Sequence, residues 1–187
     1  MDNINKYNCD LSICIPCHNL ENYIARCINS ILRQDFNGYK SEIIFICDYC
    51  TDNTFNIINN IMGKVGIPYI VEEQKYKSCG WARNRALELS TGKYIQFIDG
   101  DDYLLGTDVY LKLIPLMEKY DVVRFGYIAD FRRERAGWEV WSFLFSRKII
   151  GDIRFRNDTD KKEELAVLED KNFRDEVFEK NPSVAVG

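Results

Sequence analysis

The sequence predicts an α/β fold in a single domain, with a mainly parallel, Rossmann-like sheet flanked by helices. Short apolar, β-prone runs alternate along the chain with segments in which apolar residues recur at helical spacing. The chain has 187 residues, of which 46% are hydrophobic, and this is enough for one domain with a sizeable core. Strands that alternate with amphipathic helices favour a parallel sheet with right-handed crossovers.

The first strand is expected at residues 11–15, a continuous apolar run that Pro16 ends. Apolar residues then recur at helical spacing over residues 23–32. We expect Asn19 to cap this helix, because its side-chain oxygen can accept a hydrogen bond from an unpaired amide at the helix start.

The same unit is repeated in the next part of the chain. Residues 42–47 are expected to form the second strand, and residues 55–62 the second helix. Thr51 or Asp52 is expected to cap this helix, and Gly63 to end it.

Residues 68–71 are expected to form the third strand and residues 81–89 the third helix, which Thr91 and Gly92 close. Residues 94–98 follow as a fourth strand. Ligands bind outside the carboxyl ends of the strands in such sheets, so the loops after the strands are the expected place of the chemistry.

The second half of the chain is expected to contain a further strand at residues 122–127 and an aromatic-rich segment at residues 138–145. Trp141 is expected in the core. Trp138 is left open between the core and a wall on which a sugar stacks. Residues 181–187 are expected to be a frayed end.

The composition bears on the class of partner. A net charge of −4 at pH 7 argues against general nucleic-acid binding. The basic cluster of Arg132, Arg133 and Arg135 is expected to be a solvated loop, with an anionic acceptor or a membrane surface as the alternative partner. No apolar run approaches the roughly 20 residues that span a bilayer, and the amino terminus has no signal-peptide layout, so we expect a cytoplasmic protein without a transmembrane segment.

The seven cysteines are expected to be reduced thiols. Cys14 and Cys17, together with Cys47 and Cys50, form two C-x-x-C pairs whose spacing is that of a four-thiolate zinc site. Cys14 and Cys47 lie within expected strands, where cysteine acts as a small apolar side chain. Neither pair opens a helix that would depress a thiol pKa. A zinc-stabilised interaction domain stays open as an alternative.

Three carboxylates follow the fourth strand within four residues, at Asp99, Asp101 and Asp102. Such a cluster repels itself unless a cation is present, and its oxygens suit Mn²⁺ or Mg²⁺, which can neutralise a nucleotide diphosphate. The alternative is an acidic turn that stops the strand. The sequence contains neither a G-x-G-x-x-G nor a P-loop motif, so the phosphates must be held by metal and side chains.

His18 is the only histidine of the chain. A single histidine excludes a His-rich metal site and a Ser-His-Asp triad together. Taken alone, His18 fits a capped loop residue with no role in chemistry better than a site residue.

Several ordered segments carry a family resemblance, and they are residues 12–19, 47–54, 80–87, 94–102 and 168–170. Together they resemble the family 2 glycosyltransferases with the A-type fold, from about residue 11 to about residue 173. The resemblance implies one glycosyltransferase domain over residues 1–187. Its donor-binding half is expected at about residues 10–105 and its acceptor half at about residues 106–180.

By the same resemblance, Pro16, His18 and Asn19, with Glu21 beside them, match the loop that packs around the donor base and ribose. Asp48 matches the aspartate that hydrogen-bonds the uracil edge. One departure from the family pattern is visible in this region.

The departure lies in the residues around Asp48. Relatives have two adjacent acids followed by Gly-Ser, whereas this chain has Cys47, Asp48, Tyr49 and Cys50. One acid is missing and a bulky tyrosine replaces glycine. The resemblance therefore implies a UDP-sugar donor but leaves guanosine and thymidine open as bases.

Arg83 matches the position near the diphosphate, where a planar guanidinium suits phosphate oxygens, and a surface arginine is the alternative. Asp99, Gly100 and Asp101 match the D-x-D motif. Asp101 is the expected direct ligand of Mn²⁺ or Mg²⁺, and Asp99 the expected partner of the ribose or of a metal-bound water. Gly100 is expected to let the backbone approach the donor closely, and Asp102 to support the loop.

Asp170 matches the general base of inverting members, which removes the proton of the acceptor hydroxyl. The alternative for the pair Glu169-Asp170 is an acidic helix start, which the helix dipole favours anyway. The resemblance implies a nucleotide-sugar donor and a saccharide or lipid-linked acceptor in surface polysaccharide synthesis. It also implies a place in the cytoplasm, with peripheral contact at the inner face of the membrane.

Relatives continue with helices that close over the acceptor, so a fragment, a short natural form or a chain with limited activity is expected. The alternatives to an active enzyme are a nucleotide-sugar binding module without turnover and the zinc-stabilised interaction domain.

Overall fold

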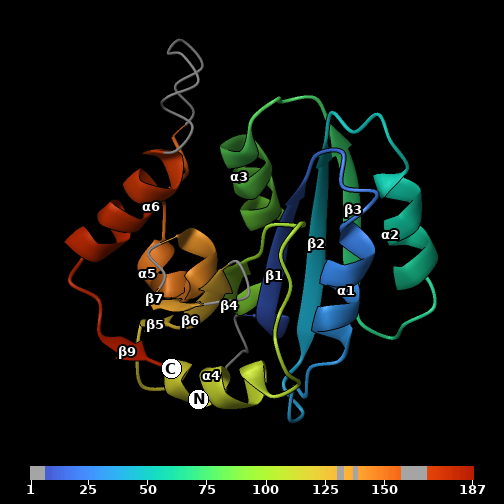
Figure 1. Ribbon diagram of the computed structural model, residues 1–187. Coiled ribbons are helices and arrows are strands. Elements are labelled where there is room, and N and C mark those ends of the chain that lie inside the picture. Colours follow the sequence, from blue (N-terminus) through green and yellow to red (C-terminus); the bar gives the residue numbers. More distant parts are fainter. Residues whose placement is uncertain (1–6, 130–132, 137–138, 157–167) are drawn as a thin grey trace.

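The computed structural model describes residues 7–129, 133–136, 139–156 and 168–187 (Figure 1). A seven-stranded sheet forms its centre, with the strand order β3-β2-β1-β4-β8-β5-β9. The strands of this sheet are β1 (Cys9–Cys17), β2 (Ser41–Asp48), β3 (Tyr69–Gln74), β4 (Gly92–Phe97), β5 (Val122–Arg124), β8 (Phe143–Ser146) and β9 (Val184–Val186). A separate antiparallel pair consists of β6 (Gly126–Ala129) and β7 (Arg133–Ala136).

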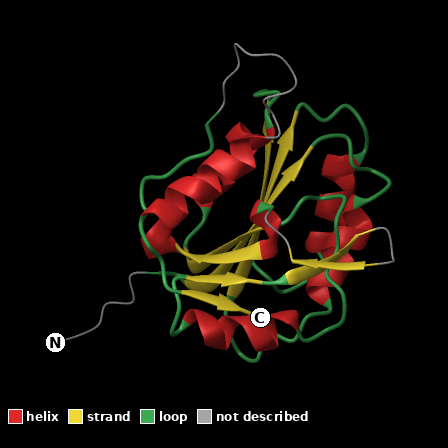
Figure 2. Ribbon diagram, turned by 60° about the vertical axis from the view of Figure 1, so that its left-hand side comes forward, coloured by secondary structure: helices red, strands yellow, loops and turns green. Residues whose placement is uncertain are grey.

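Helices lie on both faces of the sheet (Figure 2). They are α1 (Ile24–Leu32), α2 (Thr54–Met62), α3 (Cys79–Leu89), α4 (Val109–Met117), α5 (Arg147–Ile150), α6 (Leu168–Glu179) and the 3-10 helix η1 (Val140–Ser142). The predicted α/β fold is confirmed, as are the four parallel strands and three helices expected in the first half. None of the helices in the described ranges is long and apolar enough to cross a bilayer.

The first four strands are parallel to one another. β1 pairs with β2 on one side and with β4 on the other, and β3 pairs with the outer side of β2. The chain thus moves outward from β1 to β3 and then crosses back to β4. The carboxyl ends of β1 and β4 form the topological switch point, where open α/β sheets bind their ligands.

The second half of the sheet differs from the expectation in two places. The expected strand at residues 122–127 is divided, because β5 joins the main sheet while β6 pairs with β7. The expected frayed end is wrong, because β9 pairs in parallel with β5, with Val122 opposite Val184. Asp121 supports this pairing, since its Oδ2 accepts hydrogen bonds from the amide and the hydroxyl of Ser183 at 3.1 and 2.8 Å.

Alternate strand residues contribute to two cores, one on each face. Ile13, Phe45 and their neighbours pack under α1, α2 and α4. Cys14, Phe97 and their neighbours pack under α3, α5 and α6. On this second face Phe173 of α6 stacks on Phe155 with ring centroids 4.1 Å apart, which fixes the first turns of α6 beside the end of β4.

The expected end of α2 is confirmed, but the expected N-terminal caps of α1 and α2 are wrong. Asn19 does not cap α1, since this helix begins at Ile24 and has no side-chain cap. The N-cap of α2 is Asn53, which makes no side-chain cap, so neither Thr51 nor Asp52 holds that position. Asp52 lies one residue earlier, and its Oδ1 accepts the amide of Thr54, the first residue of α2, at 3.0 Å. α2 stops before Gly63, as expected.

The remaining expectations concern the aromatic and basic segments. Trp141 lies in η1 and is half-buried. Trp138 and Arg132 lie outside the described residues. The backbone of Arg133 and Arg135 forms β7 rather than a loop, because it pairs with β6.

Candidate functional site

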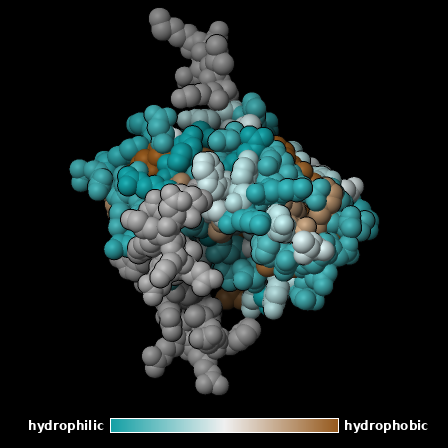
Figure 3. Space-filling view, turned by 90° about the horizontal axis from the view of Figure 1, so that it is seen from above, coloured by the Kyte–Doolittle hydropathy of each residue, from teal (hydrophilic) through white to brown (hydrophobic). Residues whose placement is uncertain are grey.

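A cavity of about 530 Å³ lies at the carboxyl ends of β1 and β2. Its lining residues are Pro16, Cys17, His18, Asp48, Tyr49, Lys77, Ser78, Cys79 and Ala82. Three of the predicted donor-binding residues are among them, namely Pro16, His18 and Asp48. The described surface over this edge of the sheet is largely hydrophilic (Figure 3).

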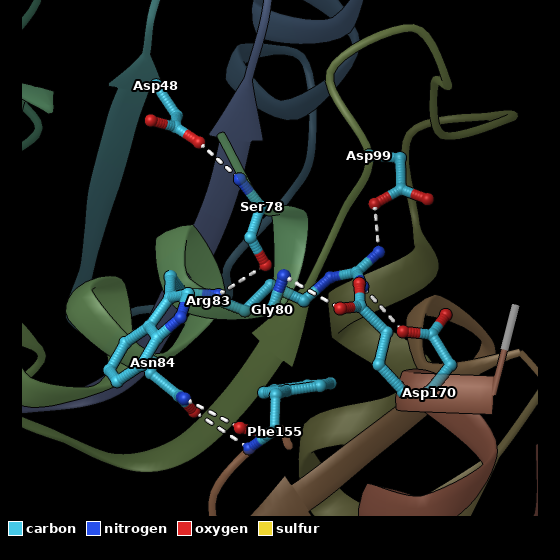
Figure 4. Close-up of polar contacts among 10 residues, drawn as sticks. Asp48, Ser78, Gly80, Arg83, Asn84, Asp99, Phe155 and Asp170 are labelled. Carbon is cyan, nitrogen blue, oxygen red and sulfur yellow. Dashed lines mark hydrogen bonds and ion pairs between the residues drawn. The ribbon is translucent and has the colours of Figure 1, made fainter. Parts of the chain in front are cut away.

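Asp48 organises the wall of the cavity. Its carboxylate is buried, with Oδ2 accepting the amide of Ser78 at 2.8 Å (Figure 4). Oδ1 accepts the amide of Tyr76 at 2.6 Å. Ser78 in turn caps α3, since its hydroxyl accepts the amide of Trp81 at 3.4 Å. Nδ1 of His18 lies 2.8 Å from the carbonyl oxygen of Asp48, so this ring nitrogen donates a hydrogen bond. Asp48 therefore connects β2, the following loop and α3.

Asn19 and Glu21 contact a neighbouring loop and do not line this cavity. Oδ1 of Asn19 accepts the amide of Thr51 at 2.8 Å, and Oε2 of Glu21 accepts the amide of Asn53 at 3.1 Å. Asn19 has a positive φ of 51°, a conformation that asparagine tolerates better than most residues. These two side chains join the loops after β1 and β2.

Arg83 of α3 lies at the centre of a cluster of carboxylates (Figure 4). Its Nη2 is 2.7 Å from Oδ1 of Asp99, at the end of β4. Its Nη1 is 3.1 Å from Oε1 of Glu169 and 2.5 Å from Oδ1 of Asp170, both in the first turn of α6. The side chain is only 4% exposed, so the alternative of a surface arginine is wrong.

The cluster carries one positive charge against three carboxylates. Burial raises the pKa of Glu169 and of Asp170, and the attraction of Arg83 offsets this only in part. A partly buried site with excess negative charge favours the approach of a cation.

The loop after β4 contains Asp99, which belongs to this cluster, followed by Gly100 and Asp101. Gly100 is buried, and a Cβ there would lie 2.6 Å from Cδ1 of Leu20 and 3.3 Å from Cδ1 of Ile24. A side chain at position 100 would therefore displace the ends of these two side chains. Asp101 is exposed, and its carbonyl oxygen accepts a hydrogen bond from Nη2 of Arg26 at 2.9 Å.

The pKa of Asp102 is affected by the other carboxylates of this loop. Burial, together with repulsion from Asp101 and Asp99, raises the pKa of Asp102 to about 6. Within the described ranges no three His, Cys, Asp or Glu side chains already converge on a common ion position. The oxygen donors of Asp99 and Asp101 and the uncompensated charge fit a hard divalent cation whose shell is completed by water or phosphate.

The cysteines do not form a four-thiolate site. Cys17 and Cys47 lie opposite each other in neighbouring strands, and Sγ of Cys50 donates to the carbonyl oxygen of Cys17 at 3.5 Å. Cys14 faces the other side of the sheet, in the second core. Burial raises the pKa of Cys14, which keeps it a neutral thiol. The alternative of a zinc site built from the two pairs is contradicted by this geometry.

Two cavity residues were missed because no spacing pattern reveals them. Tyr49 and Lys77 both adopt a positive φ, of 55° and 56°, and Nζ of Lys77 lies 4.5 Å from the ring centroid of Tyr49. Strained backbone of this kind concentrates at functional sites. Ser78 lies three residues before the start of the expected helix at residues 81–89, and serine is a residue type that often caps helices.

Comparison with known proteins gives the family. The family model described as Glycosyl transferase family 2 matches residues 12–176. The poly(ribitol-phosphate) beta-N-acetylglucosaminyltransferase TarS of Staphylococcus aureus is 32% identical over 93 residues, which are 50% of this chain and 16% of that protein. The UDP-Glc:alpha-D-GlcNAc-diphosphoundecaprenol beta-1,3-glucosyltransferase WfaP of Escherichia coli is 37% identical over 100 residues, which are 53% of this chain and 38% of that protein. The matched segments thus span less than half of either relative.

Solved structures share the fold. The S. aureus TarS 1-349 structure in complex with UDP-GlcNAc has a TM-score of 0.79 and 21% identity, and the match covers 95% of this chain and 56% of that one. The mannosyltransferase PcManGT from Pyrobaculum calidifontis, in complex with GDP-Man and Mn²⁺, has a TM-score of 0.73 and 15% identity, with 97% and 55% covered. The glycosyltransferase A-type fold is thereby confirmed. Because the family model matches most of the sequence, the chain belongs to glycosyl transferase family 2.

Proposed function

We propose that this chain is the catalytic, donor-binding domain of a metal-dependent, inverting glycosyltransferase. It moves a sugar from a UDP-sugar to an acceptor hydroxyl of a saccharide or lipid-linked glycan in surface polysaccharide synthesis. The observation that carries the proposal is that Asp99 and Asp170 both form ion pairs with Arg83. The three residues lie next to a cavity of about 530 Å³.

The cavity is the proposed site of the donor nucleotide. Pro16 and His18 would lie against the base and ribose, and Asp48 would face the base edge. Both carboxylate oxygens of Asp48 already accept an amide, but each keeps a second lone pair for a base N–H. The complex of TarS with UDP-GlcNAc supports uridine, whereas the complex of PcManGT contains GDP-Man, so guanosine is the comparison to test.

Asp101 and Asp99 would hold the divalent cation, Mn²⁺ or Mg²⁺. When bound, the cation supplies neutralisation of the charge that develops on the departing nucleoside diphosphate. Asp101 is exposed and Asp99 is 28% exposed, so both carboxylates are accessible to a hydrated ion. The raised pKa of Asp102 supports this assignment in part, because repulsion from Asp101 and Asp99 adds to the effect of burial.

Asp170 would act as the general base. Its carboxylate takes the proton of the acceptor hydroxyl while the hydroxyl oxygen forms a bond to the anomeric carbon, and the bond from that carbon to the diphosphate oxygen breaks on the opposite face. The anomeric configuration is therefore inverted. Asp170 is 23% exposed, which leaves an approach for the acceptor.

The acceptor is proposed to be presented at the inner face of the membrane, with the domain in peripheral contact with it. The name of WfaP includes a diphosphoundecaprenol acceptor, which supports a lipid-linked substrate.

Calorimetric titration of UDP and GDP, with Mn²⁺ and again with a chelator, tests the donor site. We expect UDP to bind only with the metal, and Asp101→Asn to abolish this binding. Asp108→Asn, a change at an exposed residue paired with Lys112, serves as the matched control. Binding that survives the chelator and Asp101→Asn would contradict the metal-dependent site.

Turnover is tested by release of UDP from UDP-sugars with and without saccharide acceptors. We expect Asp170→Asn to keep metal-dependent UDP binding and to lose turnover. Binding without any release of UDP by the unmodified chain would instead support a nucleotide-sugar binding module.

A further inference from the structure

The side chain of Arg83 connects two parts of the molecule that are far apart in sequence. On the donor side it contacts Asp99, 16 residues later, and on the acceptor side it contacts Glu169 and Asp170, 86 and 87 residues later. Both N–H bonds of Nη1 have carboxylate partners, and Nε is buried without a hydrogen-bond partner in the described part of the structure. The terminal nitrogens of Arg83 therefore contact carboxylates and do not face an open cavity.

We propose that Arg83 is a positioning residue that joins the loop after β4 to the first turn of α6 and thereby holds Asp170 in place to remove the acceptor proton. The inference rests on the proposed function. It differs from the expected role of Arg83 as a ligand of the donor diphosphate.

Other contacts of the first turn of α6 show that Arg83 acts within a larger support. Oε2 of Glu169 accepts the amide of Gly80 at 3.1 Å, which ties α6 to the first turn of α3. The guanidinium carbon of Arg83 lies 5.4 Å from the ring centroid of Phe155, and Phe173 of α6 stacks on the same ring. The guanidinium is thus fixed by packing as well as by charge.

The neighbouring charges define what Arg83 does for Asp170. The ionisable groups that face Asp170 are Arg83 from α3, Asp99 after β4, Glu139 before η1 and its neighbour Glu169. Arg83 is the cation among them, so it favours the ionised form that a general base needs. A planar fork with two terminal nitrogens reaches both sides of the site, whereas the single ammonium of lysine reaches one.

The first test compares Arg83→Lys with Arg85→Lys. Arg85 lies on the same helix and pairs with Glu72 and Glu88, away from the cluster, so it is the matched control. We expect kcat of Arg83→Lys to fall about 100-fold, the penalty typical of a displacement of about 1 Å at a reacting group. The Kd of UDP with Mn²⁺ should change by less than about threefold, since no bond to the donor is lost.

Arg83→Lys also defines the result that would contradict the positioning role. A lysine keeps the charge that a phosphate needs. Turnover of Arg83→Lys equal to that of the unmodified chain would therefore overturn the positioning role.

A second variant tests the ionisation of Asp170. Arg83→Gln should move the acidic limb of the kcat/KM profile to higher pH by about one unit, the size expected for the loss of a neighbouring opposite charge. Glu169→Gln removes a negative neighbour of Asp170 and should move the acidic limb of the kcat/KM profile to lower pH. If the acidic limb of the kcat/KM profile stays where it is in Arg83→Gln while the affinity for UDP falls about 100-fold, Arg83 is a phosphate ligand and the proposal is overturned.

A third measurement does not depend on activity. Amide hydrogen exchange of the first turn of α6, measured without donor, should be about tenfold faster in Arg83→Lys than in Arg85→Lys, because a charge-assisted hydrogen bond is lost. Equal exchange in the two variants would refute the bridge. If the unmodified chain neither binds nucleotide nor turns over, the proposed function fails while this measurement still decides the role of Arg83.

Discussion

Asn84 of α3 holds both backbone polar groups of Phe155. Its Nδ2 donates to the carbonyl oxygen of Phe155 at 2.9 Å, and its Oδ1 accepts the amide of Phe155 at 2.8 Å. Phe155 lies in an irregular segment that has no strand partner, so these two bonds replace a sheet ladder. Because Phe155 stacks on Phe173, Asn84 helps to place α6 and the candidate base at its start.

Asn84→Ala should therefore destabilise the fold. The change removes both hydrogen bonds between Asn84 and the buried backbone of Phe155, and we expect a loss of about 3 kcal/mol in the free energy of unfolding, measured with urea. Asn56→Ala, on the exposed face of α2, is the control and should change the free energy by less than about 0.5 kcal/mol. An Asn84→Ala variant as stable as the control would show that Phe155 is held by packing alone.

Asp48→Asn tests the role of this carboxylate as an organiser of the cavity wall. An amide group can accept only one of the two backbone N–H bonds that Asp48 accepts, so the amide of Tyr76 or of Ser78 loses its partner. We expect a stability loss of about 1–3 kcal/mol and faster hydrogen exchange in the loop before α3. Unchanged exchange there, with weaker binding of UDP, would assign Asp48 to the donor alone.

Three glycines provide a graded test of close packing. A Cβ at Gly92 would lie 2.6 Å from the backbone nitrogen of Ser12, whereas at Gly100 it would meet the end of the flexible Leu20 side chain, and at Gly66 it would meet nothing within 4 Å. Substitution by alanine should cost about 3 kcal/mol at Gly92, about 1 kcal/mol at Gly100 and nothing measurable at Gly66. Urea unfolding gives the order, and a Gly100 cost equal to that at Gly92 would contradict the argument.

The first half of the fold was predictable because its signal is local. Strands buried on both faces read as continuous apolar runs, and helices that cover one face repeat at 3.6 residues, so each element is visible within about ten residues of sequence. β9 carries no such signal. Its three residues form a strand only because β5 offers a free edge, which depends on the finished sheet.

The candidate site was predictable only as a set of residues. The loops named in advance do lie at the carboxyl edge, because the topology places them there. Their partners did not follow from spacing. Asn19 and Glu21 contact the loop after β2, and Arg83 contacts α6, so each assignment depends on which segment folds against which.

The charge of the loop after β4 predicts an unusual dependence of stability on pH. The pKa of Asp102 is raised to about 6 in the folded chain, while an aspartate in the unfolded chain has its ordinary pKa near 4. The folded state therefore binds the proton more tightly, so the contribution of Asp102 to stability is most favourable below pH 4 and is lost as the pH rises toward 6.

In the absence of divalent cations, Asp102→Asn should be more stable than the unmodified chain at pH 7 and equal to it near pH 4. Thermal unfolding across this range checks the sign, and Mn²⁺ at pH 7 should reduce the difference, because a cation that neutralises Asp99 and Asp101 removes their repulsion of Asp102. A stability difference between Asp102→Asn and the unmodified chain that does not change with pH would contradict the raised pKa of Asp102.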